Sequence, residues 1–251
     1  MIPRYALVRP PGKKYGQCIS GHPLHHTISL AHAREQHQNY CQILEELGLE
    51  LITMPTEDEH PDSCFVEDTH IIHKGKALIT RMAKESRRGE EEAIVKILQN
   101  YLEVKEVTAP ATIEGGDVIH PPNRLICGIT QRTNQEGVNQ MEAWLDVSVD
   151  TIVDPSIVHL KSHITYLGQN TMIATETYAN HPFLKKFNVL VVPKDESYAA
   201  NTLTISDVVL MPQNFPKTHT LITEAGFEVV TLQMTEFEKC EGALTCLSLL
   251  F

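Results

Sequence analysis

The sequence predicts an α/β fold in which five similar units close into a circular array, and two observations lead to this prediction. The first is a layout that recurs in five stretches: a short β-rich run, a polar or proline-containing gap, and two further apolar runs separated by a turn. The second is helical periodicity in the segments between these stretches. Equivalent points of the repeat lie roughly 41 to 48 residues apart, within the range of repeat architectures: Thr69, Asp117, Ser162, Leu203 and Cys246.

The β-rich stretches cover most of the chain, and the last is completed from the opposite end. It has only two runs, and the N-terminal residues "YALVRP" supply the third. An array whose last unit is closed by the first strand forms one domain, so we expect a single α/β domain over residues 1–251. The five stretches are residues 49–80, 104–130, 149–175, 187–212 and 227–251.

Two of the intervening segments have clear helical periodicity. Residues 89–104 place their apolar side chains on one face, and Ser86 ahead of them is a plausible cap. Residues 28–48 show the same pattern and stop at Gly48, a good C-terminal signal. Weaker helices are expected over residues 133–146, 177–187 and 214–225.

Composition is that of an ordinary globular protein and excludes several function classes. Apolar residues make up 42% of the chain, and no apolar run approaches the roughly 18 residues that a membrane span needs. The N-terminus lacks the basic-then-apolar layout of a signal peptide, so we expect a cytoplasmic protein. The formal net charge of −11 argues against a nucleic-acid partner, because a phosphate-binding surface needs clustered Lys and Arg.

The cysteines indicate the same compartment. Six are scattered along the chain without C-x-x-C spacing, and nothing suggests secretion, so we expect all six to be thiols. Cys246 lies in an apolar run near the end of the chain, and free cysteine is often a buried core residue. This segment alone therefore favours a structural role for Cys246, and only the rest of the chain changes that interpretation.

A circular array brings its equivalent points together at the central axis. The five points carry or adjoin the strings "FVEDT", "IEGGD", "VHLKS", "AANTL" and "ALTCL", which contain acids, a histidine and a cysteine. Unpaired buried charge is expensive, so a hydrophobic repeat has no structural need for such groups at its centre. The pattern therefore predicts an active site at the axis, with Cys246 as its nucleophile.

The chain resembles the dimethylarginine dimethylaminohydrolases in six strings that occur in order: "DSCFVEDT", "SRRGE", "IEGGDV", "QRTNQEG", "VHLKS" and "GALTCLS". This family belongs to the guanidine-modifying pentein superfamily, and the resemblance covers essentially the whole chain, starting at "LVRPPG". It implies a five-bladed α/β propeller of ββαβ units around a central active site. It also implies a hydrolase that converts Nω-methylated arginines to citrulline and a methylamine.

The resemblance implies three catalytic residues. Cys246 is the nucleophile, His159 is the general acid and base, and Glu114 is the carboxylate that serves both the guanidinium and the histidine. The thiolate attacks, and a bound cation lowers the pKa of the cysteine when substrate is present. Attack and loss of the amine leave a covalent thiouronium. Neither a metal nor an organic cofactor is implied.

The resemblance also carries substrate-binding positions. Glu67 and Asp68 are expected near the guanidinium end, and Arg87 and Arg132 are expected to hold the substrate α-carboxylate. A planar guanidinium fork suits a carboxylate better than a lysine does. The full implied set is Asp62, Phe65, Glu67, Asp68, Arg87, Arg132, Ile19 and Cys240, with Phe65 as an apolar wall.

Two of these positions depart from the family pattern. Cys240 replaces an aliphatic residue whose main chain binds the substrate α-amine, and its thiol is either inert or able to pair with Cys246 under oxidation. Ile19 replaces a lid leucine whose carbonyl touches the substrate, so recognition by the backbone is retained. The lid, residues 16–26, is expected to be a mobile polar loop, because its three histidines lack further zinc ligands at suitable spacing.

Two other functions are open from the sequence. An arginine deiminase would act on unmethylated arginine, but such enzymes are typically longer. The two activities differ in whether the pocket has room for the methyl groups of the substrate, and each methyl group changes the binding free energy by only about 1–3 kcal/mol. A non-enzymatic propeller, like the ribosome anti-association factors, would need no central cysteine, histidine and acids. The expected partner is a small guanidino molecule, with no nucleic acid and no membrane, and the resemblance makes a homodimer plausible.

Overall fold

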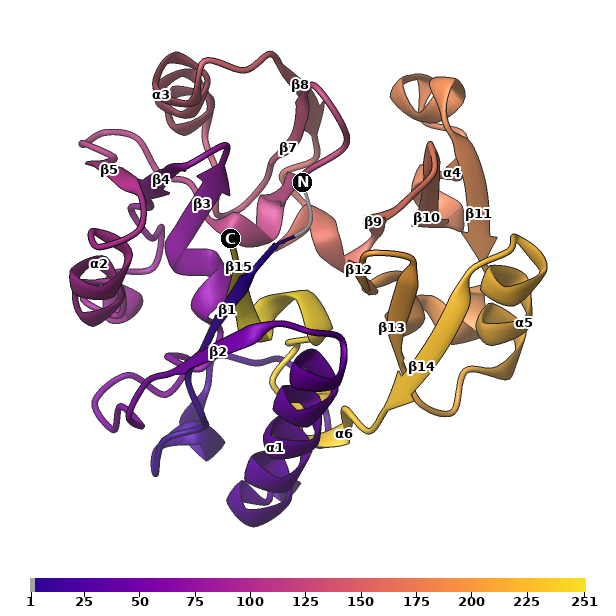
Figure 1. The fold of residues 1–251 in the computed structure, drawn as a ribbon, viewed down its shortest axis with the longest axis horizontal. Coiled ribbons are helices and arrows are strands. Elements are labelled where there is room, and N and C mark those ends of the chain that lie inside the picture. The colour runs from indigo at the N-terminus through magenta and orange to yellow at the C-terminus, as the bar shows by residue number, and fades with distance from the viewer. Residues whose placement is uncertain (1–2) are drawn as a thin grey trace.

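The computed structural model describes residues 3–251 and contains five three-stranded sheets set around a central axis (Figure 1). Every sheet has the same topology. Its inner and middle strands pair antiparallel, and its outer strand pairs in parallel with the middle one. A parallel neighbour needs a crossover connection, and a helical segment supplies it in each sheet. The predicted propeller of five ββαβ blades is confirmed.

Four blades follow one another along the chain, and in each of them the inner strand comes first, the middle strand second and the outer strand last. They are β3 (His70–His73), β4 (Lys76–Ile79) and β5 (Glu103–Glu106); β6 (Val118–Ile119), β7 (Leu125–Ile129) and β8 (Val149–Val153); β9 (Ile164–Gly168), β10 (Thr171–Thr175) and β11 (Asn188–Val192); and β12 (Leu203–Ile205), β13 (Val208–Pro212) and β14 (Glu228–Leu232). The first run of each predicted stretch therefore belongs to the preceding blade.

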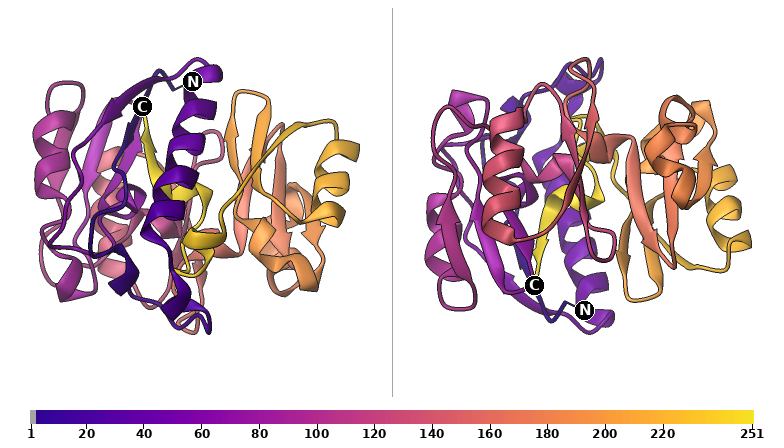
Figure 2. Two further views of the ribbon diagram at one scale, coloured as in Figure 1. Left: turned by 90° about the horizontal axis from the view of Figure 1, so that it is seen from below. Right: turned by 90° about the horizontal axis from the view of Figure 1, so that it is seen from above.

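The two ends of the chain form the remaining blade. The C-terminal strand β15 (Ser248–Leu250) pairs antiparallel with β1 (Tyr5–Val8), and β1 pairs in parallel with β2 (Glu50–Thr53). The register sets Ala6 opposite Leu250. Figure 2 shows the first and last strands side by side in both views. Because this blade joins both ends of the chain, it closes the ring.

Helices lie at the periphery of the ring, outside the sheets (Figure 1). Ser29 caps the longest one, accepting a hydrogen bond from the His32 amide, and that helix ends before Gly48, whose φ is +89°. The predicted cap Ser86 is wrong, because it lies in a separate short turn, Glu85–Arg87. The helices are α1 (Leu30–Glu46), α2 (Glu92–Leu98), α3 (Gln135–Leu145), α4 (Glu176–Ala179), α5 (Pro216–Glu224) and α6 (Thr235–Glu238).

The helices pack on the sheets through apolar side chains that are fully buried. In α2, Ile94 and Leu98 are 0% exposed and pack in one cluster with Leu7 of the closing blade. Burying each such side chain contributes about 1.5–3 kcal/mol. Within residues 3–251, no helix is long and apolar enough to cross a membrane.

Five short 3-10 turns point toward the axis, and each leads into the inner strand of a blade. Thr69, Asp117, Ser162 and Cys246 lie in four of these turns, as the repeat predicts. Leu203 does not, because the fourth turn ends at Ala200 and Leu203 already belongs to β12. The turns are η3 (Val66–Thr69), η5 (Gly115–Asp117), η6 (Leu160–Ser162), η8 (Lys194–Ala200) and η9 (Leu244–Leu247).

Candidate active site

A cavity of about 510 Å³ opens where the central turns meet. Nine of the eleven predicted site residues line it, although they come from segments spread over the whole chain. The other two, Glu67 and Glu114, lie directly behind the wall and contact residues of the central turns. The lining residues from the predicted set are Ile19, Asp62, Phe65, Asp68, Arg87, Arg132, His159, Cys240 and Cys246.

His159 is held by carboxylates from two other blades. Its Nε2 lies 2.8 Å from Oε2 of Glu114 and 3.7 Å from Oδ1 of Asp68. Burial alone would lower the pKa of His159, but the charge of Asp68 and the hydrogen bond to Glu114 outweigh it and raise that pKa to about 9. The imidazole is therefore protonated at neutral pH and holds a proton to donate.

The two glycines of "IEGGD" allow the turns of neighbouring blades to approach closely. A Cβ at Gly115 would lie 2.0 Å from the main-chain oxygen of Glu67. A Cβ at Gly116 would lie 2.8 Å from the ring of His159 and 2.8 Å from Oδ1 of Asp68. The Gly116 amide instead donates to that same oxygen at 3.1 Å. These glycines are thus required by the packing around His159, and are more than a turn signal.

Cys246 lies in η9 on the cavity wall and is 9% exposed. Burial, followed by the negative charges of Asp68 and Glu67, raises the pKa of its thiol to about 12, and the positive charge of Lys161 opposes this. The thiol is therefore neutral in the empty site. A cationic ligand beside the acids would favour the thiolate, which is the nucleophilic form.

Glu67 pairs with Lys161, a buried lysine of the string "VHLKS" for which the sequence predicted no role. Burial raises the pKa of Glu67 to about 7, and Lys161 opposes the rise. The Oε2 atom of Glu67 is buried and accepts no hydrogen bond. Glu67 thus brings negative charge close to Cys246 from behind the wall and is not a lining group.

The two predicted arginines differ in how many of their nitrogens are already paired. All three nitrogens of Arg87 donate to carboxylates, with Nε and Nη2 on Glu90 and Nη1 on Asp68. In Arg132, Nε and Nη1 are buried and find no acceptor among residues 3–251, although Nη1 lies 3.9 Å from Oε1 of Glu114. Arg132 therefore has the free donors that a bound carboxylate needs.

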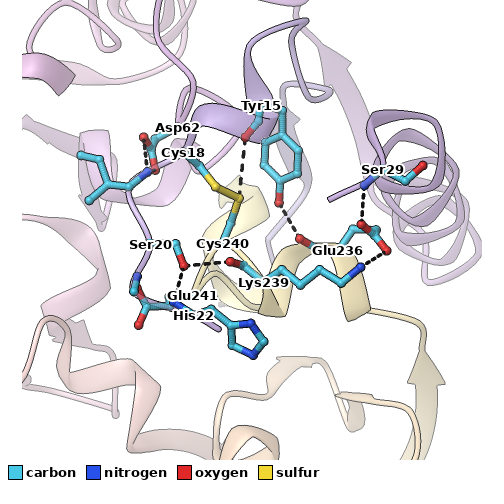
Figure 3. Close-up of a disulfide and its surroundings, with 12 residues drawn as sticks. Tyr15, Cys18, Ser20, His22, Ser29, Asp62, Glu236, Lys239, Cys240 and Glu241 are labelled. Carbon is cyan, nitrogen blue, oxygen red and sulfur yellow. Dashed lines mark hydrogen bonds and ion pairs between the residues drawn. A yellow bond between two sulfur atoms is a disulfide. The ribbon is translucent and has the colours of Figure 1, made fainter. Parts of the chain in front are cut away.

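The lid lines part of the cavity and is anchored to the segments that carry Asp62 and Cys240. Asp62 accepts the Ile19 amide at 3.2 Å, and a disulfide joins Cys18 to Cys240 (Figure 3). The prediction of six thiols is therefore wrong for these two cysteines. Cys240 pairs with Cys18 and not with Cys246, which is a free thiol.

Further hydrogen bonds connect the lid to the segment that carries Cys240 (Figure 3). Ser20 donates to the carbonyl of Lys239 at 2.8 Å, and the Gly21 amide donates to Glu241 at 2.8 Å. Where the sequence predicts a mobile loop, the structure therefore has a segment fixed by a covalent bond and several polar contacts.

Sequence reasoning used Asp117 only as a repeat marker, but it organises the site from within the protein. It is fully buried, accepts the Leu160 amide at 2.9 Å and the Thr133 hydroxyl at 2.6 Å. Thr133 in turn accepts the Glu114 amide at 3.2 Å. Asp117 thus fixes the backbone next to both His159 and Glu114. The signal was present as the second acid of "IEGGD".

Within the described chain, Asp68, Glu114 and His159 offer ligand atoms within 4.8 Å of one another, close enough to hold a metal ion. The charges nearby oppose it. Arg87 donates to Asp68 at 2.9 Å and lies 3.9 Å from Glu114, so guanidinium charge already compensates these acids. A protonated His159 adds to that positive charge. The group is better suited to hydrogen bonding than to a divalent cation.

The chain matches the family model "N,N dimethylarginine dimethylhydrolase, eukaryotic" over residues 20–248. It is 34% identical over 226 residues to the N(G),N(G)-dimethylarginine dimethylaminohydrolase of Pseudomonas aeruginosa, covering 88% of this chain and 89% of that protein. It is 35% identical over 255 residues to the enzyme of that name from Streptomyces coelicolor, covering 99% and 97% of the two chains.

Solved structures agree with these matches. A structure described as the Pseudomonas aeruginosa enzyme, a cysteine-to-serine mutant complexed with citrulline, superposes with a TM-score of 0.97 at 31% identity over 100% of both chains. A histidine-to-glycine variant of the dimethylarginine dimethylaminohydrolase, as an adduct with S-methyl-L-thiocitrulline, gives 0.96 at 32% identity over 100% of both chains. On sequence and fold together, the chain belongs to the dimethylarginine dimethylaminohydrolase family of pentein hydrolases.

Proposed function

We propose that this protein hydrolyses Nω-methylated arginines to citrulline and a methylamine through a covalent intermediate on Cys246. One observation carries the proposal: a free thiol, a protonated imidazole and a buried acid converge on one cavity. The relatives named for this activity, and the citrulline and thiocitrulline ligands of the solved structures, support it.

The substrate would bind by charge at both of its ends. Asp68 lines the cavity, and Glu67 lies just behind it, so the guanidinium would sit in a negative environment beside Cys246. The free donors of Arg132 would bind the α-carboxylate. Asp62 and the main chain at Ile19 and Cys240 would surround the α-amine, and Phe65 would supply an apolar wall.

The reaction would proceed in two halves. The Cys246 thiolate attacks the guanidinium carbon and forms a C–S bond, and the His159 imidazolium then protonates the amine nitrogen as its C–N bond breaks. A thiouronium remains on the sulfur. Neutral His159 next takes a proton from water, and the resulting hydroxide adds to the same carbon. The C–S bond then breaks as the hydroxyl proton of the adduct passes to the departing sulfur, which releases the neutral ureido product and the Cys246 thiol. The proton of this thiol leaves for solvent when the next cationic substrate binds.

Glu114 would orient His159 through both halves and favour its charged form, because a buried carboxylate 2.8 Å away stabilises the imidazolium. In the first half this retains the proton for the leaving amine. In the second half it stabilises the imidazolium that forms when water is deprotonated.

A citrulline assay run side by side on arginine, monomethylarginine and asymmetric dimethylarginine tests the proposal. We expect product from the methylated substrates and none from Cys246→Ser, with Cys64→Ser, another buried free cysteine, as the matched control. Turnover by Cys246→Ser would refute the nucleophile. Faster turnover of arginine than of either methylated substrate would refute the substrate class.

We also propose that the protein acts as a homodimer, which the family resemblance supports. Sedimentation equilibrium across a range of protein concentrations would separate a dimer from a monomer.

A further inference from the structure

The segment directly after the central turn of the fourth blade presents a polar side chain, Asn201, that has no part in the proposed chemistry. It follows η8 directly, is 3% exposed, and lines the same cavity as His159 and Cys246. It belongs to the string "AANTL", the one repeat point of the five without an acid, a histidine or a cysteine.

The Asn201 amide bonds to the turns of two other blades. Its Nδ2 donates to the carbonyl of Lys161 at 3.1 Å and to Oγ1 of Thr245 at 3.0 Å. Its Oδ1 accepts the Thr245 amide at 3.2 Å. Both N–H donors and the carbonyl are therefore used. The reversed amide would set its oxygen against the carbonyl of Lys161, so only one orientation satisfies all three partners.

These partners are close neighbours of the reacting groups. Lys161 is two residues after His159, and Thr245 directly precedes Cys246. The turns themselves are short, at three residues for η6 and four for η9. Short 3-10 turns have few internal hydrogen bonds and poor bond geometry, so contacts from outside determine how firmly they are held.

We propose that Asn201 is a positioning residue that keeps the turn bearing Cys246 in register with the turn bearing His159. Attack by the sulfur and proton donation to the leaving amine require Cys246 and His159 to reach the same guanidinium at the same time. A misplacement of about 1 Å can cost about 100-fold in rate. This inference rests on the proposed function for the catalytic roles of Cys246 and His159. Its structural basis is the three hydrogen bonds of the Asn201 amide.

Asn201→Ala tests this against a control from the same blade. Glu196 likewise takes part in three hydrogen bonds, accepting from the Lys217 amide and from the amide and hydroxyl of Thr218 at the start of α5, and it does not line the cavity. We expect Asn201→Ala to lower kcat about 100-fold with KM changed less than about threefold. Glu196→Ala should lose stability but keep kcat within about threefold.

Two substitutions at Thr245 refine the test. Thr245→Val removes the hydroxyl that Asn201 contacts, whereas Thr245→Ser retains it. We expect the valine variant to lose kcat and the serine variant to recover most of it. The double variant Asn201→Ala with Thr245→Val should be little worse than Asn201→Ala alone. The hydrogen bond between Asn201 and the Thr245 hydroxyl, which Thr245→Val breaks, is already absent from Asn201→Ala.

Alkylation of Cys246 by iodoacetamide, followed by peptide mass spectrometry, needs no turnover. We expect Asn201→Ala to alkylate faster than the wild type at a given pH, since a looser turn exposes the buried thiol, while Glu196→Ala does not. A folded Asn201→Ala variant with unchanged kcat and unchanged alkylation would overturn the inference. So would equal losses of kcat in Asn201→Ala and Glu196→Ala. A wild type that hydrolyses no guanidino substrate would refute the proposed function, and the alkylation comparison would still decide the role of Asn201.

Discussion

Nε2 of His159 lies 2.8 Å from Oε2 of Glu114, although the two residues are 45 positions apart and precede the central turns of adjacent blades. Each is the extended residue directly before its turn, with φ of −133° for His159 and −130° for Glu114. Equivalent positions of the repeat thus supply the carboxylate and the imidazole that share this hydrogen bond. The symmetry of the fold accounts for how residues so distant in the chain meet.

Replacing the acid of this pair should lower the pKa of the imidazole. In Glu114→Gln the hydrogen bond can persist but the charge is lost, so the pKa of His159 should fall from about 9 toward its ordinary value. We expect kcat to fall about 100-fold or more, with the larger loss above neutral pH, where less imidazolium remains. The pH–rate profile and NMR titration of the histidine would measure both effects.

The exposed Asp195→Asn provides the control for this substitution, because Asp195 pairs only with surface Lys217. It should leave the profile unchanged. An unaltered pKa of His159 in Glu114→Gln would show that Asp68 and Asp117 alone determine the charge of the ring.

The same shift makes stability depend on pH. The pKa of His159 is about 9 in the folded protein and near 6.5 when unfolded, so the folded state holds the proton more tightly. Its stabilising contribution, on the order of 3 kcal/mol, is complete below the unfolded pKa and is lost as pH rises through the folded pKa.

Urea unfolding of the wild type and of His159→Gln isolates this contribution. The free energy of unfolding of the wild type should decline relative to the variant between about pH 6.5 and about pH 9. Glu67 also has a raised pKa, but it is present in both proteins and cancels in the difference. The charge of His159 lowers the pKa of Asp117, so its loss in the variant makes the measured decline smaller than the contribution of His159 alone. A constant difference across this range would mean that His159 is not protonated in the folded state.

Ligand binding should change the ionisation of Cys246. With a pKa of about 12, the thiol of the free protein should show no thiolate absorbance at neutral pH. An unreactive cationic guanidino acid should produce it, because positive charge beside Asp68 and Glu67 offsets the acids that raise that pKa. Ultraviolet difference spectra, with Cys246→Ser as the blank, would record the change. Thiolate absorbance in the unliganded protein at neutral pH would contradict this order of events.

The sequence predicted the blades well because their signals are local. Short β-rich runs and apolar helix faces such as that of Ile94 and Leu98 depend on residues a few positions apart. The turn before β12 was misplaced for a structural reason. Two residues, Asn201 and Thr202, separate η8 from β12, so the polar residue at the cavity is Asn201, and Leu203 already belongs to the strand.

The site was less predictable where it depends on long-range approach. Cys18 and Cys240 are 222 residues apart, and only the packing of the lid against the segment after α6 brings them together. The pairing of Lys161 with Glu67 likewise depends on how turns of the propeller face one another. Family strings placed these residues in the right region but could not assign their partners.

Arg132 should control affinity more than rate. Its Nε and Nη1 have no hydrogen-bond acceptor in the structure, so a substrate carboxylate would be their partner. Arg132→Lys should raise KM about 10- to 100-fold for substrates with an α-carboxylate, since one bidentate contact is worth about 1.5–3 kcal/mol. The change in kcat should be small.

A decarboxylated substrate analogue supplies the comparison for this variant. The wild type and Arg132→Lys should bind it equally weakly, because the contact that the variant weakens is missing from the ligand. An equal loss of affinity for both ligands would place the α-carboxylate elsewhere.

The disulfide between Cys18 and Cys240 should stabilise both the protein and its lid. Removing it with Cys18→Ser should lower the free energy of unfolding by about 2–4 kcal/mol, because the bond restricts the unfolded chain. KM should also rise, since Ile19 and Cys240 both line the cavity and would no longer be joined. Urea unfolding and steady-state kinetics would measure the two effects.

Dithiothreitol should reproduce in the wild type what Cys18→Ser does, and should have no further effect on the variant. The free cysteine Cys41, replaced by serine, is the matched control and should shift stability by less than about 0.5 kcal/mol. Thiol titration of the unfolded, unreduced wild type should find four groups. Finding six would mean that the bond does not form in the isolated protein, and the polar contacts of Ser20 and Gly21 would then hold the lid alone.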